Sequence, residues 1–392
     1  MANEIVLAGA CRTAIGRFLG ALTRVPAWQL GGAAIKGAVE RSGIKPEQVD
    51  EVIMGNVVSA GMGQAPARQA AIAGGLPPTV NCVTINKVCG SGTKAVSMAA
   101  QAIKAGDEEI VIAGGLESMS CVPFYFFKGR SGQKMGNMEL TDGVIHDGLW
   151  CAFEDQHMGC LGDFTAANSG ITREEQDEWA ANSQAKALKA IADGKFKAEI
   201  VPFEIPQRKG DPILFDTDEG PRETTAEKLA RLRPAFGKEG TITPGNAPGL
   251  NDGAAAMAVM TAEKAAELGV TPDATVVGYA SAHVEPKMLF YAPVEAVKKL
   301  MAKTGESIGD YDLIEINEAF SAQVLADGKE LGWDWDRVNV NGGAVALGHP
   351  IGASGARILV TLIHALKDRG LKRGLATACL GGGGAVAMSI TI

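Results

Sequence analysis

The sequence predicts an α/β protein in which a strand-rich and helix-rich unit occurs twice, with a loop domain inserted between the two copies. Three observations support this: the composition, a repeated order of strands and helices, and a charged region between the repeats. The chain has 392 residues, of which 46% are hydrophobic and only 5% aromatic. Its 50 glycines are spread among alanine- and valine-rich segments. This is typical of a tightly packed α/β protein, and the length allows about two to four packed units.

The first copy lies in the N-terminal part of the chain. Runs rich in β-branched residues predict strands at 51–58, 83–88 and 109–113. Between the last two strands, residues 93–104 have the apolar pattern of a helix, and Gly106 follows as a stop signal.

The last third of the chain repeats this order. It has predicted strands at 312–317 and 338–341, a helix at 356–366 that Gly370 ends, and a returning strand at 374–379. Because the intervals nearly match those of the first copy, a duplicated unit with parallel strands and crossover helices is the economical interpretation.

The region between the copies is polar and rich in turn residues. It contains a capping-box helix start at 172–179. We therefore divide the chain into an N-terminal half (1–119 with 249–270), an inserted loop domain (120–248) and a C-terminal half (271–392). Loops beyond the carboxyl ends of strands commonly carry ligands in α/β folds, so the inserted domain is expected to bind one.

Composition and charge argue against several classes of protein. The net charge of −8 does not favour nucleic-acid binding. No apolar run approaches the ~20 residues of a membrane span, and the first ten residues lack the basic region of a signal peptide. Seven irregularly spaced cysteines fit free thiols in a reducing cytoplasm. The five histidines do not pair with cysteines at ligand spacing, so no metal site is expected.

Cys89 is the candidate nucleophile. It stands in a glycine-rich turn, 88–92, after a predicted strand and directly before a predicted helix. A helix N-terminus and free backbone N–H groups stabilise a thiolate, so we expect an activated cysteine here. A lone cysteine of this kind is more often a buried small hydrophobe. Its place opposite His349 in the duplicated architecture favours the nucleophile.

Three residues of the second copy complete an inventory for acyl transfer through a thioester. His349 lies in a glycine–proline turn, where a neutral imidazole can take the proton of a thiol and then donate to an oxyanion. Cys379 ends the last predicted strand before four glycines, where a second thiol can exchange protons with a substrate. Asn317 follows a strand; its amide can orient a water or a carbonyl oxygen, or simply cap the strand end.

With these residues in place, the chain resembles the thiolases, the family of acetyl-CoA acetyltransferases and 3-ketoacyl-CoA thiolases. The resemblance runs essentially from end to end. It is carried by the segments Val88–Gly92, Gly114–Ser120, His157–Gly159, Lys228–Phe236, Asn317–Phe320, Gly348–Gly355 and Cys379–Gly383. It implies a layered α-β-α-β-α core made of the two halves.

The resemblance also implies roles for the catalytic residues. Cys89 would become acylated, His349 would activate it, and Cys379 would move the proton of the α-carbon or of the incoming thiol. One oxyanion hole would combine His349 with a water held by Asn317, and the other would use the backbone N–H groups of Cys89 and Gly381. The reaction would be thiolytic cleavage of a 3-oxoacyl-CoA or the reverse Claisen condensation.

Coenzyme A would be a substrate rather than a permanently bound cofactor, and it would lie under the inserted loop domain. The expected contacts are Leu149, His157, Met158, Arg222, Phe236, Gly245, Leu250, Ala319 and Phe320. Family members are dimers or pairs of dimers, so a homodimer or homotetramer is expected, with a heteromeric partner subunit as the alternative.

Two departures from the family pattern concern the substrate. Pro248 replaces the serine that usually contacts coenzyme A, and a proline ring has no donor. The expected substrate pocket, formed by Met288, Phe290 and Tyr291, has two rings where short-chain enzymes have glycines, and residues 124–127 add four more rings. These rings predict either a bulky or aromatic acyl group, or an acetyl-sized pocket and an oligomer interface that they fill.

An alternative from a different class is a catalytically idle subunit with the same fold that supports a partner enzyme. The presence of Cys89, His349 and Cys379 argues against it, since an idle copy has no chemical need for all three.

Overall fold

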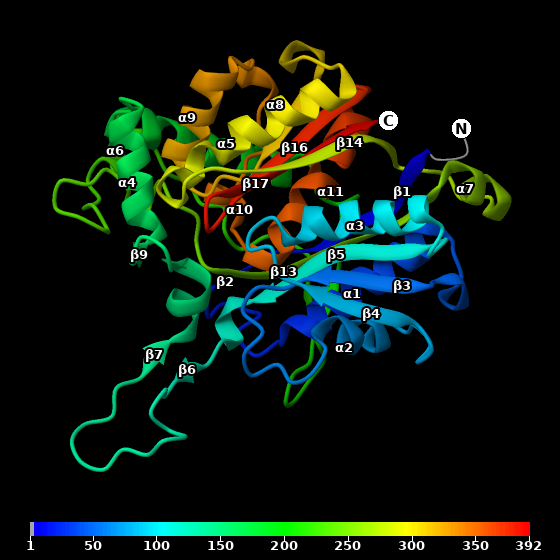
Figure 1. The fold of residues 1–392 in the computed structure, drawn as a ribbon, viewed down its shortest axis with the longest axis horizontal. Coiled ribbons are helices and arrows are strands. Elements are labelled where there is room, and N and C mark those ends of the chain that lie inside the picture. Colours follow the sequence, from blue (N-terminus) through cyan, green and yellow to red (C-terminus); the bar gives the residue numbers. More distant parts are fainter. Residues whose placement is uncertain (1–3) are drawn as a thin grey trace.

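The structure, a computed structural model that describes residues 4–392, contains a large mixed sheet with helices on both of its outer faces and between its two arms (Figure 1). The sheet has 11 strands, and the order along its main path is β15-β16-β17-β14-β1-β13-β5-β3-β4. The bounds in that order are Leu313–Ile316, Arg373–Leu380, Gly384–Thr391, Ala274–His283, Ile5–Thr13, Asn251–Thr261, Val111–Ser118, Glu51–Gly55 and Asn81–Ile85. Two short strands off this path are β2 (Gly16–Arg17) and β10 (Ile200–Val201).

The sheet divides into two arms that correspond to the two halves of the chain. The N-terminal arm is β1, β13, β5, β3 and β4, and the C-terminal arm is β14, β17, β16 and β15. They join through a short pairing in which Val6 faces Thr275 and Leu7 faces Ala274. The predicted α-β-α-β-α layering is confirmed, since helices separate and cover the arms (Figure 1).

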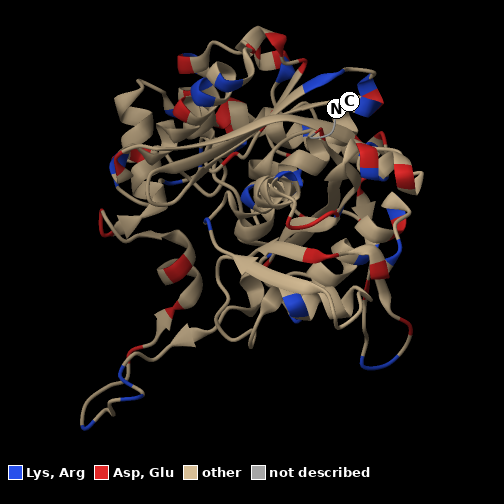
Figure 2. Ribbon diagram, turned by 45° about the vertical axis from the view of Figure 1, so that its right-hand side comes forward, with Lys and Arg blue, Asp and Glu red and all other residues tan. Residues whose placement is uncertain are grey.

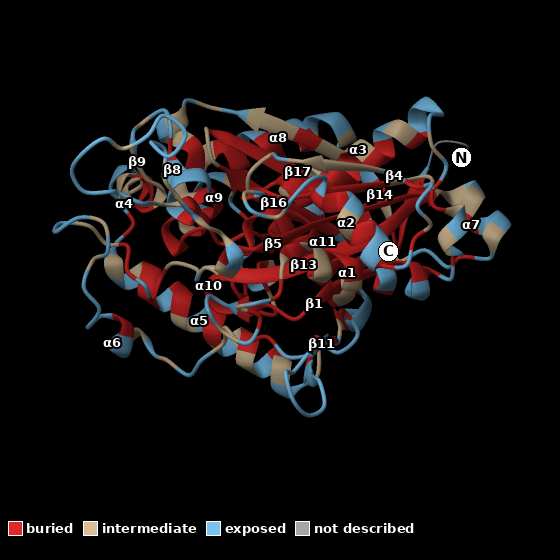
Figure 3. Cartoon of the chain, turned by 90° about the horizontal axis from the view of Figure 1, so that it is seen from below, coloured by how far each residue is buried: buried red, intermediate tan, exposed pale blue. Residues whose placement is uncertain are grey.

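Two helices fill the space between the arms, and others cover the outside. The central pair is α3 (Ser91–Ala105) and α11 (Ile351–Arg369), and α11 is mostly buried except at its C-terminal end (Figure 3). The outer helices are α1 (Ala27–Ser42) and α2 (Pro66–Ala73) on the N-terminal arm, and α8 (Ala292–Thr304) with α9 (Ser321–Leu331) on the C-terminal side (Figure 1). Shorter helices are α7 (Ala262–Leu268) and α10 (Ala344–Leu347).

Backbone contact between α3 and α11 brings their N-terminal ends together. A Cβ atom at Gly92 would lie 2.3 Å from the backbone nitrogen of Ala356, so only glycine fits. Cys89 lies just before α3 and His349 just before α11. The close contact of the helices therefore places the two candidate residues at the same end of the central layer.

The expectation of parallel strands holds for only part of the sheet. The pairs β3–β4, β3–β5 and β15–β16 are parallel, whereas the other neighbours on the main path are antiparallel. Each antiparallel pair on the main path includes β13, β14 or β17.

The predicted strand at 338–341 was wrong. It is reduced to one bridge, between Ile314 and Val338. At Asn339 the backbone takes a left-handed conformation with a φ of 44°. The Asn339 side chain then replaces the ladder, because its Oδ1 accepts from the N–H of Ile316 at 2.9 Å and its Nδ2 donates to the carbonyl of Ile316 at 3.0 Å.

Residues 120–248 lie largely outside the large sheet, to which they contribute only β10 among the described strands. They contain α4 (Met158–Asn168), α5 (Arg173–Ala192), α6 (Ala226–Leu229) and a π-helical turn at Val144–Leu149. Their short strands are β6 (Phe124–Tyr125), β7 (Thr141–Asp142), β8 (Trp150–Cys151), β9 (Gln156–His157), β11 (Phe203–Ile205) and β12 (Ile213–Phe215). The capping box at Thr172 and Glu175 is confirmed at the start of α5. A long hairpin between β6 and β7 projects from the body (Figure 1).

Candidate active site

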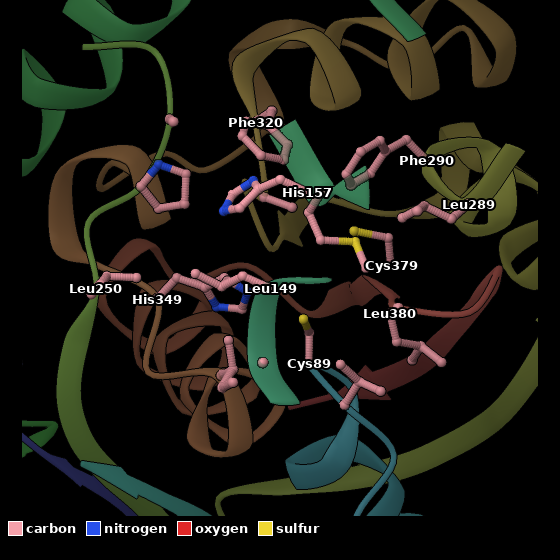
Figure 4. A pocket seen from close by; sticks show the side chains of 18 of the residues that line it. Cys89, Leu149, His157, Leu250, Leu289, Phe290, Phe320, His349, Cys379 and Leu380 are labelled. Carbon is pink, nitrogen blue, oxygen red and sulfur yellow. The ribbon is translucent and has the colours of Figure 1, made fainter. Parts of the chain in front are cut away.

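A cavity of about 300 Å³ lies where the central helices begin and the inserted segment folds over them (Figure 4). Cys89, His349, Cys379 and Gly381 line it, so residues from both halves of the chain meet there. Most of the other lining side chains are apolar, including Leu149, Leu250 and Leu289 among those in Figure 4. The cavity is therefore a largely apolar chamber with a few reactive groups on its wall.

Cys89 is held in a strained turn at the wall of this cavity. The preceding residue, Val88, has a φ of 46°, which is uncommon for a β-branched residue. Desolvation raises the pKa of the Cys89 thiol to about 12, although hydrogen bonds from the backbone of Cys89 itself and of Gly381 oppose the rise. The expectation of a resting thiolate is therefore corrected: α3 begins only at Ser91, and burial outweighs the helix end. The thiol needs a base.

The backbone around His349 is fixed by glycine and by asparagine. Gly348 has a φ of 110°, and a side chain there would collide with Asn251. The Oδ1 atom of Asn251 accepts from the backbone N–H of His349 at 2.9 Å. Asn251 in turn donates to the carbonyl of Gly16 at 2.9 Å. The histidine turn is thus tied to the N-terminal half of the chain.

Ser354 determines the tautomer of His349. The Ser354 hydroxyl lies 2.9 Å from the carbonyl oxygen of Pro350 and 2.6 Å from Nδ1 of His349. A carbonyl can only accept, so the hydroxyl donates to Pro350 and its oxygen accepts from Nδ1–H. The Nε2 atom is then free of a proton. Burial lowers the pKa of His349 to about 3, with a smaller contribution from the charge of Arg357, so the ring is neutral.

Asn317 lies beside the unprotonated nitrogen. Its Nδ2 atom is 3.4 Å from Nε2 of His349. Its Oδ1 atom is buried and has no hydrogen-bond partner among the described residues. Asn317 itself does not line the cavity but lies next to His349 on the Nε2 side of the ring, and its free acceptor fits the predicted role of holding a water.

Cys379 is the second thiol on the cavity wall. It is buried near the end of β16, where it pairs with Ala385 across a tight turn with positive φ at Gly382 and Gly383. Burial raises its pKa well above the ordinary value, and nearby Cys89 adds to the effect. The Cys89 and Cys379 side chains lie close together in Figure 4. The site therefore holds two neutral thiols and one neutral imidazole.

Most residues predicted to contact coenzyme A come together around the same cavity. Those that line it are Leu149, His157, Met158, Phe236, Leu250, Ala319 and Phe320. The His157 ring accepts from the N–H of Gly159 at 3.0 Å, at the start of α4, and stacks on Phe236 with 4.5 Å between centroids. Arg222 and Gly245 do not line this cavity. Arg222 lies in a smaller adjoining cavity, and Gly245 packs against Leu229 and Leu232.

Of the three residues predicted for the substrate pocket, only one lines the cavity. Phe290 lines the cavity and packs edge-to-face on Phe320 at 5.3 Å. Met288 does not line it, and Leu289 does. Tyr291 is removed from the pocket, because its hydroxyl lies 2.5 Å from Ser169 and 2.9 Å from Asn168, at the far end of α4.

The aromatic segment 124–127 also lies away from the cavity. Phe124 and Phe127 are exposed on the projecting hairpin, at 61% and 64% of their full accessible surface. These rings therefore do not shape the acyl site within this chain.

Three residues that fix or line the site, Ser354, Asn251 and Leu289, were not predicted from the sequence. Ser354 lies within the quoted segment 348–355, and its position five residues after His349 is a signal that was available. Asn251 is the first residue of β13, and nothing in its local sequence pattern indicated a contact with the His349 turn. Leu289 carries no chemical signal, because an apolar side chain in a short helical turn can face either way.

Among residues 4–392, no group of three or more histidine, cysteine, aspartate or glutamate side chains is placed to hold a metal ion. The same part of the chain has no helix long and apolar enough to cross a membrane.

Comparisons with known proteins agree along the whole chain. Residues 5–263 match the sequence profile described as "Thiolase, N-terminal domain", and residues 270–392 match "Thiolase, C-terminal domain". The chain is 55% identical over 389 residues to the acetyl-CoA acetyltransferase of Cupriavidus necator, with 99% of each chain covered. It is 51% identical over 390 residues to a probable acetyl-CoA acyltransferase of Staphylococcus aureus, again with 99% of each covered. The crystal structure of the Bacillus anthracis acetyl-CoA acetyltransferase superimposes with a TM-score of 0.97 at 46% identity, covering 99% of this chain and 98% of that one.

Proposed function

Because the chain belongs to the thiolase family and is a coenzyme A-dependent acyltransferase, we propose that it cleaves a short-chain 3-oxoacyl-CoA, such as acetoacetyl-CoA, and catalyses the reverse condensation. The observation that carries this proposal is the meeting of Cys89, His349 and Cys379 on one cavity. A catalytically idle scaffold would not need two thiols and an unprotonated imidazole there.

Acylation begins with transfer of the Cys89 proton to Nε2 of His349, which is the free nitrogen of the ring. The thiolate attacks the 3-oxo carbon, and the negative oxygen that forms on this carbon is stabilised by the backbone N–H groups of Cys89 and Gly381, which adjoin the Cys89 sulfur. When the bond between C2 and C3 breaks, its electron pair goes to C2 and onto the neighbouring thioester oxygen, where the new Nε2–H of His349 and a water that Asn317 holds stabilise the negative charge. Cys379 gives its proton to C2, which releases acetyl-CoA and leaves an acyl group on Cys89.

The second half of the reaction returns the acyl group to coenzyme A. The Cys379 thiolate takes the proton of the incoming coenzyme A thiol, and the resulting thiolate attacks the acyl carbon. The oxygen of the acyl group becomes negative again, and the same backbone N–H groups of Cys89 and Gly381 stabilise it. Cys89 leaves and recovers its proton from His349, so that the enzyme ends as it began.

The apolar side of the cavity suits the pantetheine arm of coenzyme A. We propose that the stacked His157 and Phe236, together with Met158 and Leu149, cover that arm. Pro248 lines the cavity without a donor, so the arm is held there by shape. Arg222 lies in the adjoining cavity, where it can reach only the outer, phosphate-bearing part of the molecule.

The acyl end of the cavity favours a short chain. Leu289 and Phe290 are buried on the wall, and the Phe290 ring is braced by Phe320. A volume of about 300 Å³ that also holds part of the pantetheine arm leaves little room for a bulky acyl group. Tyr291 and the rings of 124–127, which suggested an aromatic substrate, do not contribute to this wall.

We further propose that the chain forms a homodimer or homotetramer. Two exposed features support this. β4 is an edge strand whose residues Cys82–Ile85 are half-buried, and such an edge can pair with another chain. The projecting hairpin exposes Phe124, Phe127, Met135, Met138 and Leu140, and its tip carries basic residues (Figure 2). An apolar surface of this kind on a soluble domain usually contacts protein.

The inserted segment 120–248 is proposed as the part that binds coenzyme A and carries the oligomer contacts. Residues 1–119 with 249–270, and residues 271–392, are proposed as the two catalytic halves. The seven free cysteines fit a proposed cytoplasmic location.

Detection of a covalent acetyl adduct on Cys89 tests the proposed function. Intact-protein mass spectrometry after brief mixing with acetoacetyl-CoA should show an acetyl group that peptide mapping assigns to Cys89. The adduct should be absent from Cys89→Ala and present in Cys82→Ala, a half-buried cysteine that does not line the cavity. An adduct that persists without Cys89, or the absence of any turnover of acetoacetyl-CoA, would overturn the proposal.

A further inference from the structure

Two buried glutamates hold the turn that carries His349, one on each side of it. Glu117 lies on β5 in the N-terminal half, and Glu318 follows Asn317 in the C-terminal half. Both have no solvent exposure, and neither lines the cavity. The chemistry described above uses neither carboxylate, so their contacts require another explanation.

Glu117 holds the downstream side of the turn. Its Oε2 atom accepts from the backbone N–H of Gly352 at 2.9 Å and of Val57 at 3.0 Å. Its Oε1 atom accepts from Nδ2 of Asn56 at 2.8 Å and from the N–H of Val58 at 3.3 Å. Gly352 is in the first turn of α11, three residues after His349.

Glu318 holds the upstream side in the same manner. Its Oε2 atom accepts from the backbone N–H of Val345 and from the hydroxyl of Ser183, each at 2.9 Å. Its Oε1 atom accepts from Nε1 of Trp179 at 3.1 Å and from Nδ2 of Asn339 at 2.9 Å. Val345 is in α10, four residues before His349.

Glu117 and Glu318 share the same hydrogen-bonding pattern. Each carboxylate oxygen faces two donors, and each carboxylate takes one asparagine side chain and one backbone N–H from a helix that flanks His349. All eight partners are donors, so neither glutamate has a place for an N–H group on its side chain. At Glu117 these hydrogen bonds oppose burial, which raises the pKa of the carboxyl to about 7. Only residues 348–350 separate α10 from α11, so fixing Val345 and Gly352 fixes both ends of the histidine turn.

We propose that Glu117 and Glu318 act as a pair of positioning residues that fix the imidazole of His349 in the orientation needed to take the proton of Cys89. This rests on the proposed role of His349 as the base. The first carboxylate ties the turn to the half that carries Cys89, and the second ties it to the segment that carries Asn317. The base is therefore held relative to the nucleophile and to the oxyanion site at the same time.

The test uses Glu117→Gln and Glu318→Gln in the full-length protein. Glutamine has nearly the same size, but its NH₂ group must face two donors that the carboxylate accepted. A displacement of the base by even ~1 Å costs on the order of 10² in rate, so we expect kcat for acetoacetyl-CoA thiolysis to fall by roughly that factor. Because neither side chain lines the cavity, KM should change by less than about threefold.

Glu199→Gln is the matched control. Glu199 is equally buried and pairs with Arg12 at 2.6 Å, but it does not contact residues 345–352. Its kcat should stay within about twofold of wild type. If Glu199→Gln loses as much kcat as the two variants, or if a folded Glu117→Gln or Glu318→Gln keeps its kcat, the proposal fails. Should the glutamine variants not fold, Trp179→Phe removes one donor to Glu318 while keeping a smaller aromatic side chain at this position, and it should lose about three- to tenfold in kcat with KM unchanged.

A spectroscopic readout separates this proposal from the proposed function. The chain has only five histidines, so ¹⁵N-histidine spectra can be assigned by substitution. In the wild type, the ¹⁵N chemical shifts of His349 should show a protonated Nδ1 and an unprotonated Nε2. In the glutamine variants, the two shifts should move toward each other, as expected for a ring that exchanges between tautomers. Wild-type protein without thiolysis would overturn the proposed function while leaving this measurement valid. Unchanged His349 signals in the variants would overturn the positioning role.

Discussion

The Nδ1 atom of His349 lies 2.6 Å from the hydroxyl oxygen of Ser354, so Ser354 holds the proton on Nδ1 and leaves Nε2 able to accept one. In Ser354→Ala the ring loses this partner and can turn or change tautomer. We expect kcat of thiolysis to fall about tenfold to 10²-fold, since general-base catalysis contributes at least that much. Ser354→Thr keeps the hydroxyl and serves as the control. Wild-type kcat in the alanine variant would show that the tautomer is fixed by other contacts.

Cys379→Ala should separate acylation from carbon–carbon chemistry. With acetyl-CoA as donor, Cys89 can still be acetylated, because this step moves the acetyl group from one sulfur to another and transfers no proton to or from carbon. Condensation to acetoacetyl-CoA should fall by about 10²–10⁴, the usual contribution of a proton-transfer group. Mass spectrometry measures the adduct and a coupled assay measures the product. Normal condensation by this variant would remove Cys379 from the proton transfer.

His349 should make the fold less stable in acid. Its pKa is lowered from 6.5 to about 3, so between these values the unfolded chain binds a proton that the folded chain does not. Stability contributed by the neutral ring is therefore present above pH 6.5 and is lost as the pH falls toward 3. At pH 5 the loss is roughly 2 kcal/mol. The thermal-unfolding midpoint should drop more between pH 7 and pH 5 in the wild type than in His349→Ala, and equal drops would contradict the neutral, buried ring.

Acyl specificity should respond to Leu289 and not to Tyr291. Leu289→Ala enlarges the buried end of the cavity, and one or two methylenes are worth about 1–3 kcal/mol in discrimination. The ratio of kcat/KM for 3-oxohexanoyl-CoA to that for acetoacetyl-CoA should therefore rise roughly tenfold. Tyr291→Phe, which loses only hydrogen bonds to Ser169 and Asn168, should leave the ratio unchanged. The opposite pattern would show that Tyr291 turns into the acyl site.

The β6–β7 hairpin should control assembly. Replacing residues 127–139 with Asn-Gly removes Phe127, Met135 and Met138, which are 64%, 91% and 69% exposed. Light scattering should then give a smaller particle than the wild type, because the apolar contact surface is lost. An unchanged mass would assign the oligomer contact to other surfaces, such as the edge strand β4.

The cysteines and the histidine that meet on the cavity could be selected from the sequence because the patterns that mark them are local. Cys89 directly precedes a predicted helix, and His349 lies in a glycine–proline turn before a second helix. Both can be recognised from the residue type and the local turn pattern. α3 was predicted as 93–104 and spans Ser91–Ala105, since an apolar stripe and Gly106 mark it. The duplicated order then indicated that Cys89 and His349 belong together.

Other features could not be predicted because they depend on tertiary packing. β13 is buried on both faces and rich in alanine, so it has neither alternation nor strong strand propensity. The loss of the 338–341 strand follows from the left-handed Asn339 and its side-chain contacts with Ile316. The raised pKa of Cys89 follows from enclosure by segments distant in sequence. Which of Leu289, Phe290 and Tyr291 faces the cavity is decided by their packing against α4 and α9.

The contact between Gly92 and Ala356 has a consequence for how such an enzyme can change over time. Because peptide backbone meets peptide backbone there, the spacing of the ends of α3 and α11 is set within the central layer, and the inserted segment acts on the histidine turn mainly through the contacts of Trp179 and Ser183 with Glu318. Apart from these two residues, segments 120–248 and 286–291 can therefore acquire new substrate preferences through point mutations, insertions or recombination while the reaction itself is preserved. Mutations at position 92 have no such freedom. The central layer that carries Cys89 and His349 and the segments that cover the cavity are therefore under different selective constraints.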